Sequence, residues 1–216
     1  MKRLSFLADA FPKPKINRFT DAFTTLNHYC QVNYSIPSSS LRKLIHPRFD
    51  PYPIIHNDQA IISAVVFQEK NFRFPSIPFL GRYNFCQTNY RTYVIDKETG
   101  RRSVWFFGTT LDHFSIFIPQ LLWRFPWHKA SIQLNTSYRN AKYEKYSMVA
   151  KSDWGEAQIE VQDSGRKTSD EDFPGFPDKE TALVYLTQPM SGHFYRNESQ
   201  PRLACWEVVD YLSYDI

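Results

Sequence analysis

The sequence predicts a mainly β protein: an antiparallel sheet or barrel with a few short helices. Three short runs of strand-forming residues, at 130–138, 142–150 and 157–162, follow one another with only turns between them. Aromatic residues make up 17% of the chain, and rings pack well on pleated sheets. Because a barrel of 216 residues can form one unit, we expect a single domain over 20–216 after an irregular lead-in at 1–19.

The N-terminal part of the chain carries weaker signals. Pro12 and Pro14 interrupt regular structure in the lead-in. Thr20 could cap a helix there, but the aromatic and β-branched content of the following residues favours a strand at 24–34. The next predicted elements are a helix at 41–46 capped by serines 38–40, a short strand at 52–56 and a buried strand at 60–67.

The C-terminal half combines strands with two predicted helices. The pattern of residues 111–124 predicts a helix, although Pro119 could instead begin a shorter one at 119–124. A polar loop is predicted at 163–180. The remaining elements are a helix at 179–187 and final strands at 193–196 and 203–212.

A long β-hairpin over residues 82–110 is predicted at the centre of the chain, with turn-forming residues at 96–100. Side chains alternate along a strand, so one face of its first arm carries a polar stripe between aromatic residues. That face consists of Tyr83, Phe85, Gln87, Asn89, Arg91 and Tyr93. The stripe has two interpretations: a face in contact with water, or the lining of a ligand cavity in a small barrel.

A second candidate lies at 124–129, where the predicted helix leads into the strand at 130–138. His128 has the right chemistry for a general base, and Lys129 could become a nucleophile if burial lowered its pKa. The simpler interpretation is that both side chains face solvent beside Pro126.

Charge and motifs exclude several classes of function. The formal net charge of +4 is small and scattered, which argues against nucleic acid as a partner. Cys30, Cys86 and Cys205 are too widely spaced for a disulfide framework or a zinc site, and the histidines lack metal-ligand spacing. We therefore expect free thiols, no metal and no cofactor.

The N-terminal sequence has only a short apolar run before Asp9, too short for a signal peptide. No later run reaches the ~20 apolar residues of a membrane helix. We expect a cytoplasmic protein with no membrane partner. The sequence leaves open whether it forms a homo-oligomer.

The run FCQTNYRTYV at 85–94, followed by a turn and VWFFGTTLD at 104–112, resembles the uncharacterised YqjF-like family of the acetoacetate-decarboxylase-like superfamily. A looser match places 125–130 at the family's Leu-Pro-Tyr-x-x-Ala motif. The resemblance implies a cone-shaped, largely antiparallel β-barrel. In the true decarboxylases the barrel holds an active site with a Schiff-base lysine, a second lysine and a carboxylate.

This sequence departs from the decarboxylase pattern at each of those positions. Trp127 and His128 stand where the two lysines would be, and Gln87 stands at the position of the carboxylate. Lys129 lies two residues beyond the Schiff-base position, which can be the same face of a strand but ~6–7 Å away. The resemblance therefore implies the fold without the decarboxylase chemistry.

Together these observations predict a barrel that binds a small molecule in a cavity lined by Gln87, Asn89, Arg91, Trp105 and Trp127. Arg91 would suit an anionic ligand, since a buried guanidinium needs a partner. An alternative is a divergent lyase or hydrolase that acts on a small carboxylated substrate through Lys129 or His128. A third is an interaction protein whose aromatic surface contacts a partner chain.

Overall fold

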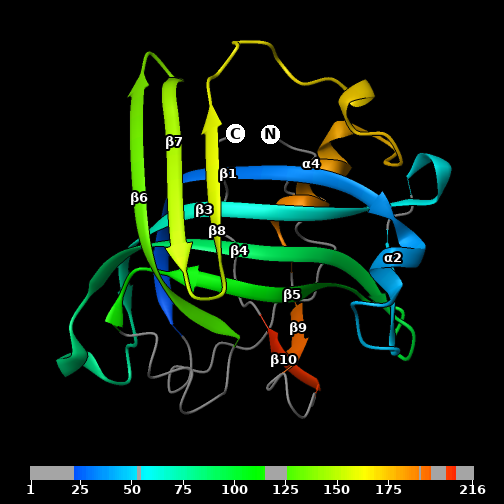
Figure 1. Cartoon of the computed structure of the whole chain (residues 1–216), viewed down its shortest axis with the longest axis horizontal. Coiled ribbons are helices and arrows are strands. Elements are labelled where there is room, and N and C mark those ends of the chain that lie inside the picture. Colours follow the sequence, from blue (N-terminus) through cyan, green and yellow to red (C-terminus); the bar gives the residue numbers. More distant parts are fainter. Residues whose placement is uncertain (1–21, 53–54, 115–125, 190, 196–202, 208–216) are drawn as a thin grey trace.

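The central feature of the fold is the long hairpin of β4 (Tyr83–Asp96) and β5 (Arg102–Leu111), which confirms the predicted hairpin. The computed structural model describes residues 22–52, 55–114, 126–189, 191–195 and 203–207. In this part of the chain the strands form one curled, mostly antiparallel sheet in the order β1-β3-β4-β5-β6-β7-β8 (Figure 1). The predicted fold class is confirmed.

The other strands are β1 (Phe23–Pro37), β2 (Phe49–Pro51), β3 (Gln59–Arg73), β6 (Trp127–Arg139), β7 (Lys142–Ser152), β8 (Gly155–Val161), β9 (Ser191–Tyr195) and β10 (Leu203–Glu207). The described helices are α2 (Ser38–Arg42) and α4 (Lys179–Thr187), with short 3-10 turns at His56–Asp58, Pro78–Leu80 and Asp170–Asp172.

Asp96 closes the central hairpin. Its carboxylate accepts hydrogen bonds from Arg48 Nε at 2.8 Å and from Thr99 Oγ1 at 2.9 Å. The Arg48 hydrogen bond holds the pKa of Asp96 well below its usual range. Gly100 adopts a φ of 68°, a conformation that costs glycine little, and its N–H donates to the Asp96 carbonyl at 2.8 Å. The turn predicted at 96–100 is thereby confirmed.

The sheet bends sharply after β5. Strands β6, β7 and β8 cross in front of β1, β3, β4 and β5 in Figure 1. β6 joins β5 through only a short parallel stretch, from Thr109↔Trp127 to Leu111↔Lys129. The crossing encloses an apolar core of Val66, Cys86, Ala130, Ile132, Tyr146, Met148 and Ala150. One face of the central strands is therefore buried beneath β6–β8.

Most of the predicted elements are confirmed, with shifted ends. The strand at 24–34 is β1, the three successive strands are β6, β7 and β8, and the helix at 179–187 is α4. Asp178 caps that helix by accepting a hydrogen bond from the Thr181 N–H at 2.7 Å. The strand at 60–67 continues to Arg73, because its second half still pairs with β1 and β4.

Two local predictions are wrong. The serines at 38–40 do not cap a later helix but form the first residues of α2, which Pro37 precedes without a side-chain cap. The strand predicted at 52–56 lies instead at Phe49–Pro51, where it pairs with the end of β4 and buries Phe49 completely. Most of the helix predicted at 111–124, and the lead-in at 1–19, lie outside the described residues.

Candidate functional site

The polar stripe of β4 lies on one buried face of the sheet. The register between β3 and β4 is unbroken from Glu69↔Phe85 to Ile62↔Thr92, so Gln87, Asn89 and Arg91 point the same way. Their exposed fractions are only 7%, 8% and 5%. We call this side of β3, β4 and β5 the Gln87 face. Its burial excludes the interpretation that the stripe is in contact with water.

Gln87 and Asn89 are joined to each other. Gln87 Nε2 donates to Asn89 Oδ1 at 2.7 Å, and Thr109 Oγ1 donates to the same oxygen at 2.9 Å. Among the described residues, Gln87 Oε1 and Asn89 Nδ2 make no hydrogen bond. The pair thus presents one acceptor and three N–H donors, two on Asn89 and one on Gln87, that the described part of the chain does not use.

Arg91 is engaged with helix α4. Its Nη2 donates to the carbonyl oxygen of Leu186 at 2.6 Å, and the guanidinium lies 5.7 Å from the centre of the Tyr93 ring. Tyr93 Oη donates to the same Leu186 oxygen at 2.9 Å. Leu186 lies in the last turn of α4, where the helix dipole is negative and carbonyls lack partners within the helix. The Arg91 side chain therefore stabilises the docking of α4.

Trp105 lies on the opposite face from Gln87. It pairs with Thr92, is 1% exposed, and its ring packs against Phe49 and Tyr195 at 5.7 and 4.8 Å between centres. A register shift in β5 is the reason: Tyr90 pairs with Gly108 but Arg91 pairs with Phe106. One extra residue reverses which face each later side chain occupies. The structure does not bring Trp105 to the predicted site.

The first three residues of β6 point in alternating directions. Trp127 pairs with Thr109 and packs against Phe85 and Leu111, so it lies on the Gln87 face. His128 stacks on Trp154 beneath the crossing strands, with 4.9 Å between ring centres and 9° between planes. Lys129 is exposed and pairs with Leu111, which in turn pairs with Gln87.

A buried carboxyl group that sequence reasoning missed also lies on the Gln87 face. Glu69 pairs with Phe85 and is 7% exposed. Its Oε2 makes no hydrogen bond within the described part of the chain. Burial raises the pKa of Glu69 to about 7, and a hydrogen bond with the Thr24 side chain lowers it by a smaller amount. Extending the alternation of β3 past Phe67 would have identified Glu69.

Other candidate features do not form a site. Over the described ranges, no cluster of three or more His, Cys, Asp or Glu side chains could hold a metal ion.

Burial raises the pKa of the free thiol of Cys30 and raises that of Cys86 to about 11. No helix within the described residues is long and apolar enough to cross a membrane.

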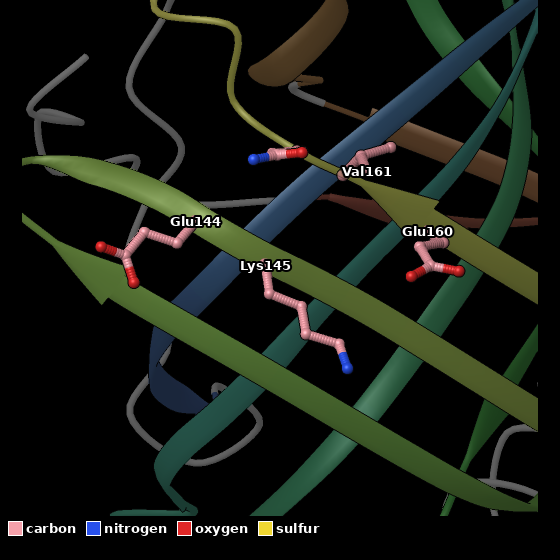
Figure 2. A pocket seen from close by; sticks show the side chains of 5 residues that line it. Glu144, Lys145, Glu160 and Val161 are labelled. Atoms are coloured by element: carbon pink, nitrogen blue, oxygen red, sulfur yellow. The ribbon is translucent and has the colours of Figure 1, made fainter.

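A surface depression of about 420 Å³ lies at the ends of β7 and β8 (Figure 2). Its lining consists of Glu144, Lys145, Glu160, Val161 and Gln162. All five residues are exposed, and none belongs to the polar stripe or to the start of β6. We regard it as a solvated part of the surface.

Residues 24–206 match the model of family DUF2071, which is described as an uncharacterized conserved protein. The chain belongs to this family. No curated protein matches the sequence. The uncharacterised family expected from the sequence is confirmed.

Solved structures share the fold at low sequence identity. Acetoacetate decarboxylase from Legionella pneumophila aligns with a TM-score of 0.59 at 9% identity, over 92% of this chain and 72% of that one. The enduracididine biosynthesis enzyme MppR, complexed with the condensation product of pyruvate and imidazole 4-carboxaldehyde, aligns with a TM-score of 0.57 at 15% identity, over 88% and 70%. MppR complexed with pyruvate aligns with a TM-score of 0.53 at 13% identity, over 81% and 65%. These likenesses show the fold alone, and they confirm the decarboxylase-like fold expected from the sequence.

We expect Arg91→Met to loosen α4. A hydrogen bond from a charged donor contributes about 1.5–3 kcal/mol, and the methionine cannot replace it. Urea denaturation should show a loss of unfolding free energy of that order. Relative to wild type, the variant should show faster amide hydrogen exchange in α4 but not in β3. Arg139→Met, at the exposed end of β6, is the matched control. Unchanged protection of α4 would contradict the role assigned to Arg91.

We expect Glu69→Gln to change how stability depends on pH. The unfolded carboxyl loses its proton near 4.5, whereas the folded one keeps it until about 7. The free energy of unfolding of the wild type should therefore fall between those values and level off above them, by at most about 3 kcal/mol. The variant lacks this fall, so it should gain stability relative to wild type from pH 4 to pH 8.

Urea denaturation of wild type, Glu69→Gln and the exposed control Glu144→Gln at both pH values measures this difference. If the difference in unfolding free energy between wild type and Glu69→Gln does not vary with pH, Glu69 is not the titrating group.

Proposed function

We propose that this protein binds one small polar molecule on the Gln87 face. The observation that carries the proposal is the pair of unused polar atoms, Gln87 Oε1 and Asn89 Nδ2, on side chains at most 8% exposed. In the described part of the chain, neither atom is among the fully buried polar atoms that lack a partner, so both stay accessible to a small molecule. A ligand that presents a donor and an acceptor side by side would hydrogen-bond to both.

The surroundings of the pair suit such a ligand. Phe85, Leu111 and Trp127 form an apolar cluster on the same face, with Trp127 half-buried. Binding sites for small molecules commonly combine apolar walls with a few polar groups that orient the ligand. The solved structures of MppR with pyruvate and with HEPES buffer are consistent with small-molecule binding in proteins of this fold.

The charge of the ligand does not follow from Arg91. Its guanidinium already donates to the Leu186 carbonyl and, at 3.4 Å, to Gln31 Oε1. An anion at Arg91 would have to compete with the end of α4. The proposal therefore rests on the two carboxamides.

We expect Gln87→Met to weaken ligand binding by about tenfold, because one hydrogen bond of about 1.4 kcal/mol is lost. Ligands would be found by mass spectrometry of small molecules released from the native protein, and by thermal shift with a library of small amides, amino acids and carboxylic acids. Gln158→Met, at an exposed glutamine of β8, should bind as wild type does.

Methionine keeps the length of the side chain, and Asn89 retains its hydrogen bond from Thr109, so the variant should fold. If no compound binds, or if Gln87→Met binds every ligand as tightly as wild type, the proposal is wrong.

A second candidate, a lyase or hydrolase that acts on a small carboxylated substrate, is favoured by the register of β6. Lys129 continues the row formed by Phe67, Gln87 and Leu111 across β3, β4 and β5. His128, the other candidate, lies on the opposite side against Trp154. An enzyme of this kind would therefore use Lys129 together with Gln87.

If Lys129 forms an imine with a keto acid, borohydride reduction in the presence of pyruvate should leave a stable adduct on this residue, located by peptide mass mapping. Lys129→Arg should abolish the adduct, and the exposed Lys151→Arg should not. Absence of an adduct on the wild-type protein would exclude the imine mechanism with pyruvate.

A further inference from the structure

Glu69 lies beside Gln87 on the same face of the sheet. Glu69 of β3 pairs with Phe85 of β4. Gln87 is two residues after Phe85, so it is the diagonal neighbour of Glu69 across the two strands. Side chains in diagonal positions are within reach of each other when one of them is long. Glu69, Gln87 and Asn89 therefore lie on the same face of neighbouring strands.

Within the described part of the chain, no charged side chain beside Glu69 could balance a carboxylate. The described neighbours on this face are Leu26 of β1, Phe67 of β3, and Phe85 and Gln87 of β4, and the Thr24 side chain hydrogen-bonds to Glu69. Lys70 comes next in the chain and therefore points to the other side of β3. The causes of the shifted pKa include burial and Thr24 but no described charged group.

A purely structural role does not account for this carboxyl group. Oε2 lacks a hydrogen bond in the described part of the molecule, although an ionised carboxylate can accept about four. An apolar side chain would pack better between Leu26 and Phe85 and would avoid the desolvation cost. A costly buried ionisable group on a polar face is a feature of functional sites.

We propose that Glu69 completes the ligand site of the Gln87 face, and that the ligand carries a cationic nitrogen, as in a small amine or guanidine, which donates to the Glu69 carboxylate. This inference rests on the proposed function and specifies its ligand class. A cation satisfies the unused oxygen and balances the carboxylate charge at the same time, whereas a neutral donor does only the first. The Gln87 and Asn89 carboxamides then bind the remaining polar atoms of the ligand.

The inference has a consequence for pH. A cation that binds ionised Glu69 displaces the proton that the empty site holds, so binding should tighten as the pH rises through about 7 and become constant above it. A neutral or anionic ligand would not show this increase.

The test uses the full-length protein and three small probes: methylguanidine as the cation, N-methylacetamide as the neutral compound and acetate as the anion. Carbon-13 NMR of glutamate-labelled protein follows the titration of the Glu69 carboxyl, and the side-chain amide signals of Gln87 and Asn89 report binding at the carboxamides. We expect methylguanidine to lower the pKa of Glu69 by about one unit or more. We also expect Glu69→Gln to weaken its binding at least tenfold.

Glu144→Gln, the same change at an exposed glutamate, should bind methylguanidine as wild type does. If Glu69→Gln does not fold, Glu69→Met provides the second variant. Binding of only the neutral or anionic probe at Gln87 and Asn89, unaffected by Glu69→Gln, would overturn this inference and leave the proposed function standing. If no probe perturbs the Gln87 or Asn89 amides, both are overturned.

Discussion

The structure depends on the strict alternation of side chains along β4, a strand buried on both faces. Cys86 packs with Val66 into the core beneath β6 and β7, while Gln87 and Asn89, at alternate positions further along β4, point the other way. Because β3 and β4 keep an unbroken register, the carboxamides of Gln87 and Asn89 and the guanidinium of Arg91 all lie on one face. A register slip of one residue would place carboxamides in the apolar core.

Two kinds of buried polar group bear on the scaffold and the Gln87 face. Asp96 with Arg48, and Arg91 with Leu186, have partners that fix the hairpin turn and the end of α4. Gln87, Asn89 and Glu69 each keep at least one polar atom without a partner among the described residues. The first kind stabilises the scaffold. The fully buried Glu69 oxygen lowers stability, and we connect all three side chains with ligand binding.

The fold is shared with an acetoacetate decarboxylase, and the Gln87 face of this chain has its own set of side chains. Trp127 and His128 begin β6, and neither can form an imine. Of these two residues only Trp127 lies on the Gln87 face, where it adds apolar surface. The nearest amine along the strand is Lys129, which is exposed. A scaffold with carboxamides, a buried carboxyl and an aromatic wall suits recognition by hydrogen bonds.

The sequence by itself determined the features that arise from neighbouring residues. The turn at 96–100, the polar stripe of β4 and the exact extent of α4 follow from turn residues, from the two-residue alternation of strands and from a capping aspartate. Tertiary structure alone decided which partners these residues meet. The Leu186 carbonyl that accepts the Arg91 hydrogen bond is 95 residues away in sequence. The register shift beside Phe106 places Trp105 on the opposite face. Pairing with β1 and β4 extends β3 far enough to include Glu69. Alternation is a local property of the backbone, whereas burial, register shifts and hydrogen-bond partners depend on segments that only the folded chain brings together.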